Sequence, residues 1–354
     1  MIIRKLKKFI HLSLLRSNKL CLFKNYFKTP PIIIFFVTSA CNSKCPHCFY
    51  KNNLNRKNDL TLGEIEKISQ SMRKVYQLEL SGGEPFLRKD LPEICELFYK
   101  NNHLEELQIP TNSLLADEIY KIVETILRKC PGIELNLNLS LDGTEKVHDL
   151  MRGVKGNFQK VMKNYQNLVI LKKTDKNLFI NITSIVSKKN IDDLFDLADF
   201  VIKNMPLVNH HYLGYERGRF YTDKIDLPQI DKLRSLNEKI EKLYRRKNGL
   251  IYTNLIKKIN EVKVKTLESQ RQVVSCVAGK LVGVIYEDGK IANCEMLPAI
   301  GKAREGNFQK VWQSQVRLKQ RKEIIEKKVC YCTHECFISP SVAYGLPGRG
   351  YIRD

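Results

Sequence analysis

Hydrophobic and polar residues alternate along the first two thirds of the chain in blocks whose period switches between two residues and about four. The block PIIIFFVTS at residues 31–39 is rich in β-branched and aromatic side chains, which is typical of a strand buried on both faces. The block IELNLNLSL at residues 133–141 alternates strictly, so its isoleucine and leucines share one face of a strand. Blocks with a helical period stand between such strand blocks.

Repeated strand and helix blocks predict parallel βα units. Strands are expected at residues 31–39, 77–81, 107–112, 133–141, 178–186 and 207–214. Helices are expected after the capping-box pattern at residues 61–64, near 91–101, and at 115–129, 157–171 and 190–204. Right-handed crossovers would curl these units into a barrel-like sheet, so the fold class is α/β.

The pattern changes after residue 225. Lysine-rich helical stretches run to about residue 269, and a hairpin with an Asp288-Gly289 turn is expected at 281–294. We therefore predict four parts: a basic amphipathic segment at 1–30, a core at 31–225, a helical connector at 226–270 and a small cysteine-rich α+β domain at 271–354. The string GNFQKV occurs twice, and Asn157 and Asn307 are each expected to cap a helix.

Composition adds a strong basic bias to this picture. The chain has 354 residues, 43% hydrophobic residues and a net charge of +22, which favours acidic partners or anionic surfaces. Residues 1–28 carry no acidic residue, so peripheral contact with a membrane is one alternative for them. The chain has no signal-peptide pattern and no run of 18 uncharged apolar residues. It has 11 cysteines in a long chain, so a reducing cytoplasm is the expected location.

Three cysteines, Cys41, Cys45 and Cys48, follow the first predicted strand as C-x3-C-x2-C. Three thiolates on one loop can bind three irons of a 4Fe–4S cluster, which leaves the fourth iron open to a chelating small molecule. A structural zinc site is the alternative; it normally needs four ligands, and only His47 or His11 is near enough in sequence to complete one.

This loop resembles the C-x3-C-x-Φ-C signature of the radical S-adenosylmethionine (SAM) enzymes, with His47 at the aromatic position. The resemblance covers residues 31–215. It implies an incomplete (β/α)6 TIM-like barrel, a 4Fe–4S cluster that binds SAM, and a 5′-deoxyadenosyl radical that abstracts hydrogen from a substrate.

The resemblance also implies cofactor contacts at the carboxyl ends of the strands. SGGEP at residues 81–85 would meet the methionyl amino group, Ser140 the carboxylate or ribose, and Arg152 the carboxylate. The expected cofactor-binding residues are Gly82, Gly83, Glu84, Pro85, Thr111, Asn112, Ser140, Asp142, Arg152, His47 and Ile185. Without the resemblance, Arg152 is a surface residue and His148 belongs to a helix start.

A second cysteine group occupies the C-terminal part. Cys276 and Cys294 form C-x12-G-x4-C, and Cys330, Cys332 and Cys336 follow. With GNFQKVWQS at 306–314, the arrangement resembles the SPASM/twitch extension of radical SAM enzymes, which implies one auxiliary 4Fe–4S cluster. Cys276 and Cys294 are expected ligands, the choice among the last three stays open, and zinc is the alternative metal. Cys21, Cys95 and Cys130 are expected to be packing residues.

An auxiliary cluster beside a radical site favours a net two-electron oxidation of a small carbohydrate-like or alcohol substrate. The second hypothesis is a peptide or protein maturase, against which we note that about 30 residues precede the first strand, too few for a leader-binding domain. The third is a zinc-bearing nucleic-acid binder, which leaves the three-cysteine loop and SGGEP unexplained. The expected electron donor is an acidic flavodoxin or ferredoxin. Glu295 is a candidate base, and His210, His211, Glu216 and Arg217 are candidates to face the substrate.

Overall fold

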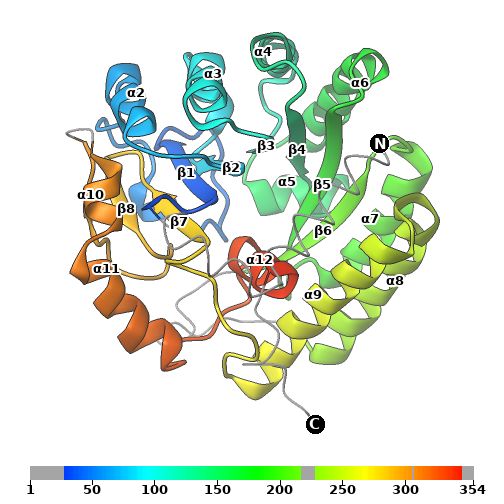
Figure 1. Ribbon diagram of the computed structural model, residues 1–354. Coiled ribbons are helices and arrows are strands. Elements are labelled where there is room, and N and C mark those ends of the chain that lie inside the picture. The colour runs from blue at the N-terminus through cyan, green and yellow to red at the C-terminus, as the bar shows by residue number, and fades with distance from the viewer. Residues whose placement is uncertain (1–27, 217–227, 305–306, 345–354) are drawn as a thin grey trace.

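The computed structural model describes residues 28–216, 228–304 and 307–344 (Figure 1). The basic N-terminal segment therefore lies almost wholly outside the described residues, as do Cys21 and Arg217.

All six expected strands are present and form one curved parallel sheet (Figure 1). They are β1 (Ile32–Thr38), β2 (Gln77–Gly82), β3 (Glu106–Thr111), β4 (Glu134–Ser140), β5 (Leu178–Val186) and β6 (His210–Tyr215), paired in sequence order. The register between β1 and β2 shifts between Phe36 and Thr38, directly before the first cysteine loop. The incomplete α/β barrel is confirmed.

Helices cover the outer face of this sheet (Figure 1). They are α2 (Leu62–Gln70), α3 (Leu91–Asn102), α4 (Ala116–Lys129), α6 (Asn157–Thr174) and α7 (Ile191–Asn204). The loops after the strands add the short 3-10 helices η3 (Lys51–Asn53) and η4 (Pro85–Leu87) and a further helix, α5 (Glu145–Arg152), that the pattern missed. The capping box of α2 is confirmed, because Thr61 and Glu64 exchange hydrogen bonds as predicted. The prediction that Asn157 caps α6 is wrong: Gly156 is the cap residue, and the Asn157 side chain makes contacts elsewhere.

The C-terminal part continues the same sheet instead of forming a separate one. After α8 (Ile230–Asn248) and α9 (Leu250–Ser269), β7 (Val282–Ile285) pairs in parallel with β1, and β8 (Lys290–Ala292) and β9 (Gly301–Lys302) follow antiparallel. The last elements are α10 (Phe308–Trp312), α11 (Gln315–Gln320), the π-helical turn η5 (Arg321–Glu326) and α12 (Glu335–Tyr344). Asn307 caps α10 as predicted, accepting from the Lys310 amide at 2.8 Å. The four domain boundaries stay predictions.

The position of α12 matters for the site. In Figure 1 this helix lies on the concave side of the sheet, between the β7–β8 hairpin and α9. Apolar side chains of α9 and α12 share one cluster, which includes Ile259 and Val342. The buried Lys263 of α9 also forms a 2.7 Å ion pair with Glu335. Among the described helices, none is both long and apolar enough to cross a membrane.

The two faces of the strands differ in chemistry. In β4, the leucines at 135, 137 and 139 are fully buried and belong to the core beneath the outer helices, as the alternation predicts. The residues between them, Asn136, Asn138 and Ser140, face a cavity on the concave side. In β1 both faces are apolar, because one packs in the outer core and the other against β7 and the C-terminal region.

Candidate active site

A large cavity on the concave side joins both groups of predicted site residues. Its volume is about 2270 Å³, and its lining includes Cys41, Cys45 and Cys48 together with Cys336 of α12. The volume exceeds the range of about 300–1,000 Å³ that holds one small ligand. A cofactor and a substrate can therefore occupy it together.

The first cysteine loop brings three thiols to the rim of this cavity. Cys41, Cys45 and Cys48 are partly exposed. Burial raises the pKa of the Cys41 thiol to about 11, so a bound metal would be needed to keep it as a thiolate at neutral pH. The hydroxyl of Ser43 lies 3.4 Å from the Cys45 sulfur. Three thiols at one rim, with open space beside them, fit a 4Fe–4S cluster that has one iron free for SAM.

Gly82 and Gly83 permit the end of β2 to lie directly against this loop. Backbone amides of Gly83 and Glu84 donate to the carbonyls of Thr38 and Ala40, each at 2.8 Å. A Cβ on Gly83 would lie 1.9 Å from the Ala40 oxygen, and one on Gly82 would lie 2.3 Å from the Thr38 oxygen. Gly82 also has φ of +112°, a conformation that other residues rarely adopt.

Replacing Gly83 with alanine should therefore destabilise the protein. We expect Gly83→Ala to lower the free energy of unfolding by about 3 kcal/mol, because the backbone of the cysteine loop must move to admit the methyl group. The matched control is Gly63→Ala in α2, where a Cβ meets no atom within 4 Å and the helix should gain about 0.5 kcal/mol. Thermal unfolding of both variants measures the difference; equal midpoints would contradict the steric argument.

Glu84 links the ends of β2 and β3 at the cavity wall. Its carboxylate accepts from the backbone amides of Asn112 at 2.7 Å and Phe86 at 3.3 Å. Burial raises the pKa of Glu84 to about 7. Asn112 in turn donates from its side chain to Asn42 of the cysteine loop at 2.8 Å. This arrangement holds a carboxylate beside the loop, where an ammonium group can be recognised.

Arg152 reaches the first cysteine loop from α5. It is buried, its Nε forms a 2.7 Å ion pair with Asp142, and another guanidinium nitrogen lies 3.8 Å from the Cys45 sulfur. His47 lies 3.6 Å from the same Asp142 carboxylate, which also accepts from the Ile185 amide at 2.8 Å. Asp142 therefore orients Arg152 and His47 and does not itself line the cavity.

Sequence reasoning missed a buried network behind Arg152. The backbone amide of Asp142 donates to His148 Nδ1 at 3.0 Å, and His148 Nε2 lies 3.1 Å from Asn157 Oδ1. Asn157 donates onward to the Asn112 carbonyl at 2.8 Å. Because Nδ1 accepts, Nε2 carries the proton and the imidazole is neutral. The network ties α5 and α6 to the ends of β3 and β4, and only the polarity of the HD pair at 148–149 hinted at it.

The neutral state of His148 predicts acid sensitivity. Burial lowers its pKa to about 4, whereas an unfolded histidine takes up a proton near pH 6.5. The stability that His148 contributes is therefore complete above pH 6.5 and falls, by about 1.4 kcal/mol per pH unit, as the pH drops towards 4. We expect His148→Asn to lose less stability between pH 6.5 and 4.5 than the wild type does.

Urea unfolding at several pH values measures this difference. A suitable control is His103→Asn, because His103 is exposed and its φ of 52° suits asparagine. The prediction fails if the two variants show the same pH dependence.

The remaining predicted contacts divide into two sets. Pro85 and Asp142 do not line the cavity. The others do: Gly82, Gly83, Glu84, Thr111, Asn112, Ser140, Ile185, Arg152 and His47. His210 and Glu295 also line it. His211 instead is buried beside Ser184, with 2.7 Å between Ser184 Oγ and His211 Nε2, and Glu216 is outside the lining.

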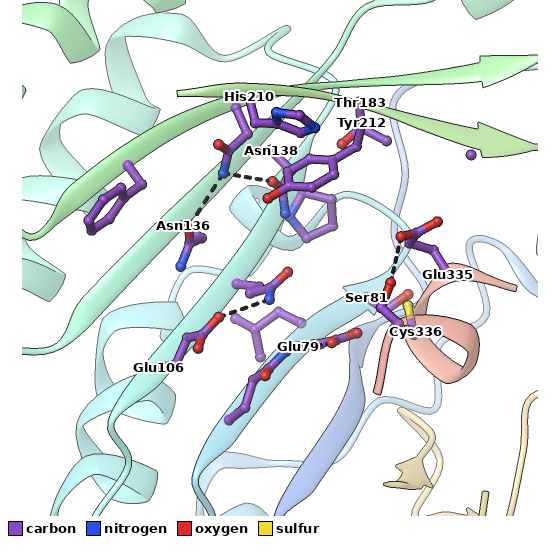
Figure 2. A pocket seen from close by; sticks show the side chains of 18 of the residues that line it. Glu79, Ser81, Glu106, Asn136, Asn138, Thr183, His210, Tyr212, Glu335 and Cys336 are labelled. Carbon is purple, nitrogen blue, oxygen red and sulfur yellow. Dashed lines mark hydrogen bonds between the residues drawn. The ribbon is translucent and has the colours of Figure 1, made fainter. Parts of the chain in front are cut away.

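The inner wall of the barrel is polar, as Figure 2 shows. The polar residues of strands β2 to β5 that line it are Gln77, Glu79, Ser81, Glu106, Gln108, Thr111, Glu134, Asn136, Asn138, Ser140, Asn181 and Thr183. Asn181 donates to Asn136 at 3.4 Å and to Asn138 at 3.2 Å. Burial raises the pKa of Glu79 to about 7. A barrel interior that serves only as a packed core is filled by branched apolar side chains. The polar side chains of this wall are instead suited to binding a polar ligand.

The C-terminal cysteines separate into two environments. Cys276, Cys294, Cys330 and Cys332 do not line the cavity, whereas Cys336 does. Burial raises the pKa of Cys294, and the nearby thiols of Cys332 and Cys276 add to the shift. Burial likewise raises the pKa of Cys276 to about 11, with Cys330 adding to it. Cys294 is thus near Cys276 and Cys332, and Cys276 is near Cys330; four thiols is the ligand number of a closed iron–sulfur or zinc site. Cys95 and Cys130 are buried in the outer core, as expected of packing residues.

Comparison with known proteins agrees with this geometry. Residues 35–201 match the family described as the Radical SAM superfamily, so this part of the chain is a radical SAM domain. Its residues fit the cofactors of that family, a 4Fe–4S cluster with SAM in the core, and the cysteine-rich C-terminal part fits an auxiliary cluster.

Individual relatives differ in their printed activities. The chain is 26% identical over 342 residues to the AdoMet-dependent heme synthase of Methanosarcina barkeri (strain Fusaro / DSM 804), covering 90% of this chain and 93% of the relative. It is 26% identical over 181 residues to the antilisterial bacteriocin subtilosin biosynthesis protein AlbA of Bacillus subtilis (strain 168), covering 50% of this chain and 38% of that relative. Among solved structures, Streptococcus suis SuiB bound to the precursor peptide SuiA has a TM-score of 0.62 at 19% identity, covering 86% of this chain and 69% of that one. This last likeness shows the fold.

Proposed function

We propose that this radical SAM enzyme carries out a net two-electron oxidation of a small polar substrate of the carbohydrate or alcohol class. The observation that carries the proposal is the polar inner wall of the barrel, which continues from the cysteine loop to α12. Amide and carboxylate side chains such as Asn138, Asn181 and Glu79 can pair with several hydroxyl or amino groups of one ligand.

When bound, the 4Fe–4S cluster with SAM supplies a 5′-deoxyadenosyl radical through one-electron cleavage of the sulfonium. The residues of this chain would bind and orient SAM. Glu84 is positioned for the ammonium group of SAM, and Arg152 for its carboxylate. Ser140 and Ile185 line the neighbouring wall, where the nucleoside would lie. In the net oxidation, one hydrogen atom leaves the substrate for the radical, and one further electron and one proton then leave it.

We assign the second electron to an auxiliary cluster held by Cys276, Cys294, Cys330 and Cys332. None of these four residues lines the cavity, and the pairs Cys294–Cys276, Cys294–Cys332 and Cys276–Cys330 are each near one another. The proton needs a base at the wall. Glu79 lines the cavity and is the candidate for that role. An acidic flavodoxin or ferredoxin is the proposed source of the first electron, since a chain of net charge +22 attracts such a donor. The cytoplasm is the proposed location.

A peptide is the second candidate substrate. The cavity of about 2270 Å³ is larger than SAM and a monosaccharide need, and SuiB, which shares the fold, is titled as bound to a precursor peptide. A tetrapyrrole is suggested by the heme synthase relative. In the same lining, Glu79 and Glu106 would repel its acidic side chains, whereas Lys172, Lys176 and Lys247 would attract them, so the substrate assay decides this candidate.

The test follows deuterium from substrate into 5′-deoxyadenosine. Reduced, reconstituted enzyme is incubated with SAM and with deuterated sugars and amino sugars, deuterated peptides, or a deuterated coproporphyrin. The proposal predicts labelled 5′-deoxyadenosine, and an oxidised product in equal amount, only with the first class. Label from peptides alone or from the porphyrin alone would overturn the substrate assignment.

A further inference from the structure

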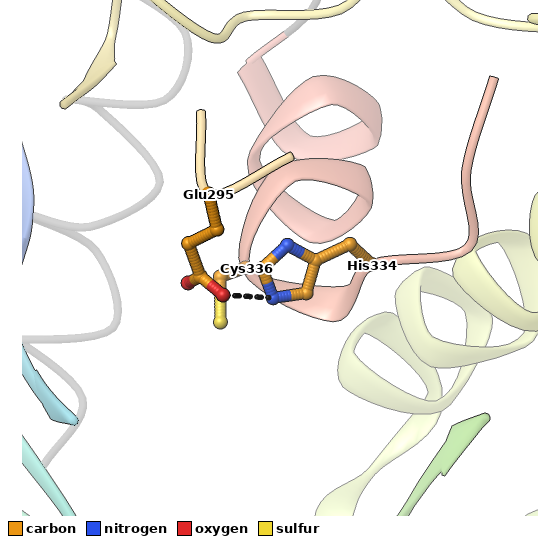
Figure 3. Close-up of side chains that lie close together, drawn as sticks. All are labelled: Glu295, His334 and Cys336. Carbon is orange, nitrogen blue, oxygen red and sulfur yellow. Dashed lines mark ion pairs between the residues drawn. The ribbon is translucent and has the colours of Figure 1, made fainter. Parts of the chain in front are cut away.

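Three side chains of different chemistry meet at the wall of the cavity. Glu295, His334 and Cys336 each offer one ligand atom, and these atoms lie within 4.8 Å of one another (Figure 3). His334 Nε2 is 3.6 Å from the Glu295 carboxylate, and the two side chains are only 2% and 4% exposed. All three border the cavity.

The chain holds these groups on two fixed elements. Glu295 follows Cys294 at the end of the β7–β8 hairpin, and Cys336 lies in the first turn of α12. His334 directly precedes this helix, and its carbonyl accepts from the amides of Phe337 at 3.1 Å and Ile338 at 2.9 Å. The Lys263–Glu335 ion pair further anchors the start of α12. The ligand atoms therefore need only small side-chain rotations to converge.

The donor set is that of a transition-metal site. One thiol, one imidazole and one carboxylate suit zinc and disfavour magnesium or calcium, which take oxygen ligands. Catalytic zinc sites use three protein ligands and leave a position open, whereas structural sites close with four. Glu79, whose carboxylate hydrogen-bonds with Cys336, adds a neighbouring group that can support the ligand.

We propose that Glu295, His334 and Cys336 bind one zinc-class divalent metal ion whose open coordination position faces the cavity. The ion would bind an oxygen or nitrogen atom of the substrate and so fix which hydrogen faces the radical. We assign the site as separate from the proposed auxiliary cluster, because Glu295, His334 and Cys336 line the cavity, whereas Cys276, Cys294, Cys330 and Cys332 do not. This inference does not depend on which substrate the enzyme takes.

The test uses holoenzyme reconstituted with iron and sulfide, then incubated with one equivalent of zinc and desalted. Zinc and iron are counted by mass spectrometry, and X-ray absorption at the zinc edge reports the ligands without interference from iron. We expect one zinc per chain, with one sulfur at about 2.3 Å and the remaining ligands nitrogen or oxygen at about 2.0–2.2 Å. Glu295→Gln, His334→Gln and Cys336→Ser should each weaken zinc binding at least tenfold while retaining the iron of both clusters.

Matched controls separate this site from its surroundings. Glu323→Gln changes an exposed glutamate of the same region and should bind zinc as the wild type does. Loss of about four irons in Cys336→Ser would make Cys336 a cluster ligand and overturn the proposal. Zinc bound equally by the wild type and by all three variants, or a zinc spectrum without sulfur, would overturn it as well.

Discussion

Replacement of Cys45 by alanine is expected to abolish formation of 5′-deoxyadenosine from SAM. Cys45 is one of three thiols at the cavity rim, and Arg152 and Ser43 both lie within 4 Å of its sulfur. Loss of an outer-shell partner of a metal ligand typically costs 10–100-fold, so loss of a ligand should cost at least about 100-fold. Chromatographic detection of 5′-deoxyadenosine under anaerobic, reducing conditions measures the effect.

Iron content provides the second readout for this variant. Two 4Fe–4S clusters require about eight irons per chain, and Cys45→Ala should retain about four. Cys95→Ala is the matched control. Cys95 is fully buried in the outer core, so this substitution removes a thiol that does not line the cavity. It should cost no more than about 2 kcal/mol of stability and keep the activity. Full activity in Cys45→Ala would refute the site.

Replacement of Cys294 by alanine should have the opposite pattern. We expect SAM cleavage to continue, while oxidation of the substrate found in the deuterium screen falls at least about 100-fold and iron falls to about four per chain. The reason is that Cys294 lies with Cys276 and Cys332 behind the cavity wall, whereas the loop that would bind SAM follows β1. Comparing 5′-deoxyadenosine with oxidised product in one assay separates the two steps.

Cys130→Ala is the control for Cys294→Ala, because Cys130 is also buried but belongs to the outer core. It should retain both reactions. If Cys294→Ala loses SAM cleavage and substrate oxidation together, while its iron falls, the C-terminal thiols have a structural role and do not serve the second electron.

The sequence predicted the barrel because its signals are local. The alternation in β4 and the apolar run of β1 are set by which faces of each strand are buried, and each is visible within a single short segment. The three-cysteine loop was equally local. The capping box of α2 was recognisable for the same reason, since its two partners are three residues apart.

What the sequence left unpredicted depends on contacts between distant segments. His148 bonds to Asp142 and Asn157, and its role appears only when α5 and α6 pack behind the strand ends. The pairing of β7 with β1 joins residues about 250 apart, so no local pattern predicts it. The same holds for Cys336: the sequence left open whether it binds the auxiliary cluster, and only the folded chain brings its thiol beside Glu295 and His334.

The polar wall of the barrel was predictable only in part: the sequence shows its residues but not their role. In β4 the asparagines at 136 and 138 alternate with the leucines, and such positions usually face solvent. Only the curvature of the sheet, with α12 on its concave side (Figure 1), makes them part of a cavity lining.

The most direct test of the central claim is electron paramagnetic resonance of anaerobically reconstituted protein reduced with dithionite. To isolate the first cluster, the measurement uses the Cys294→Ala variant. The account predicts the signal of a reduced 4Fe–4S cluster whose shape changes when SAM is added, because SAM binds the iron that the three cysteines leave open. A reduced cluster with a spectrum indifferent to SAM, or no cluster signal at all, would contradict it.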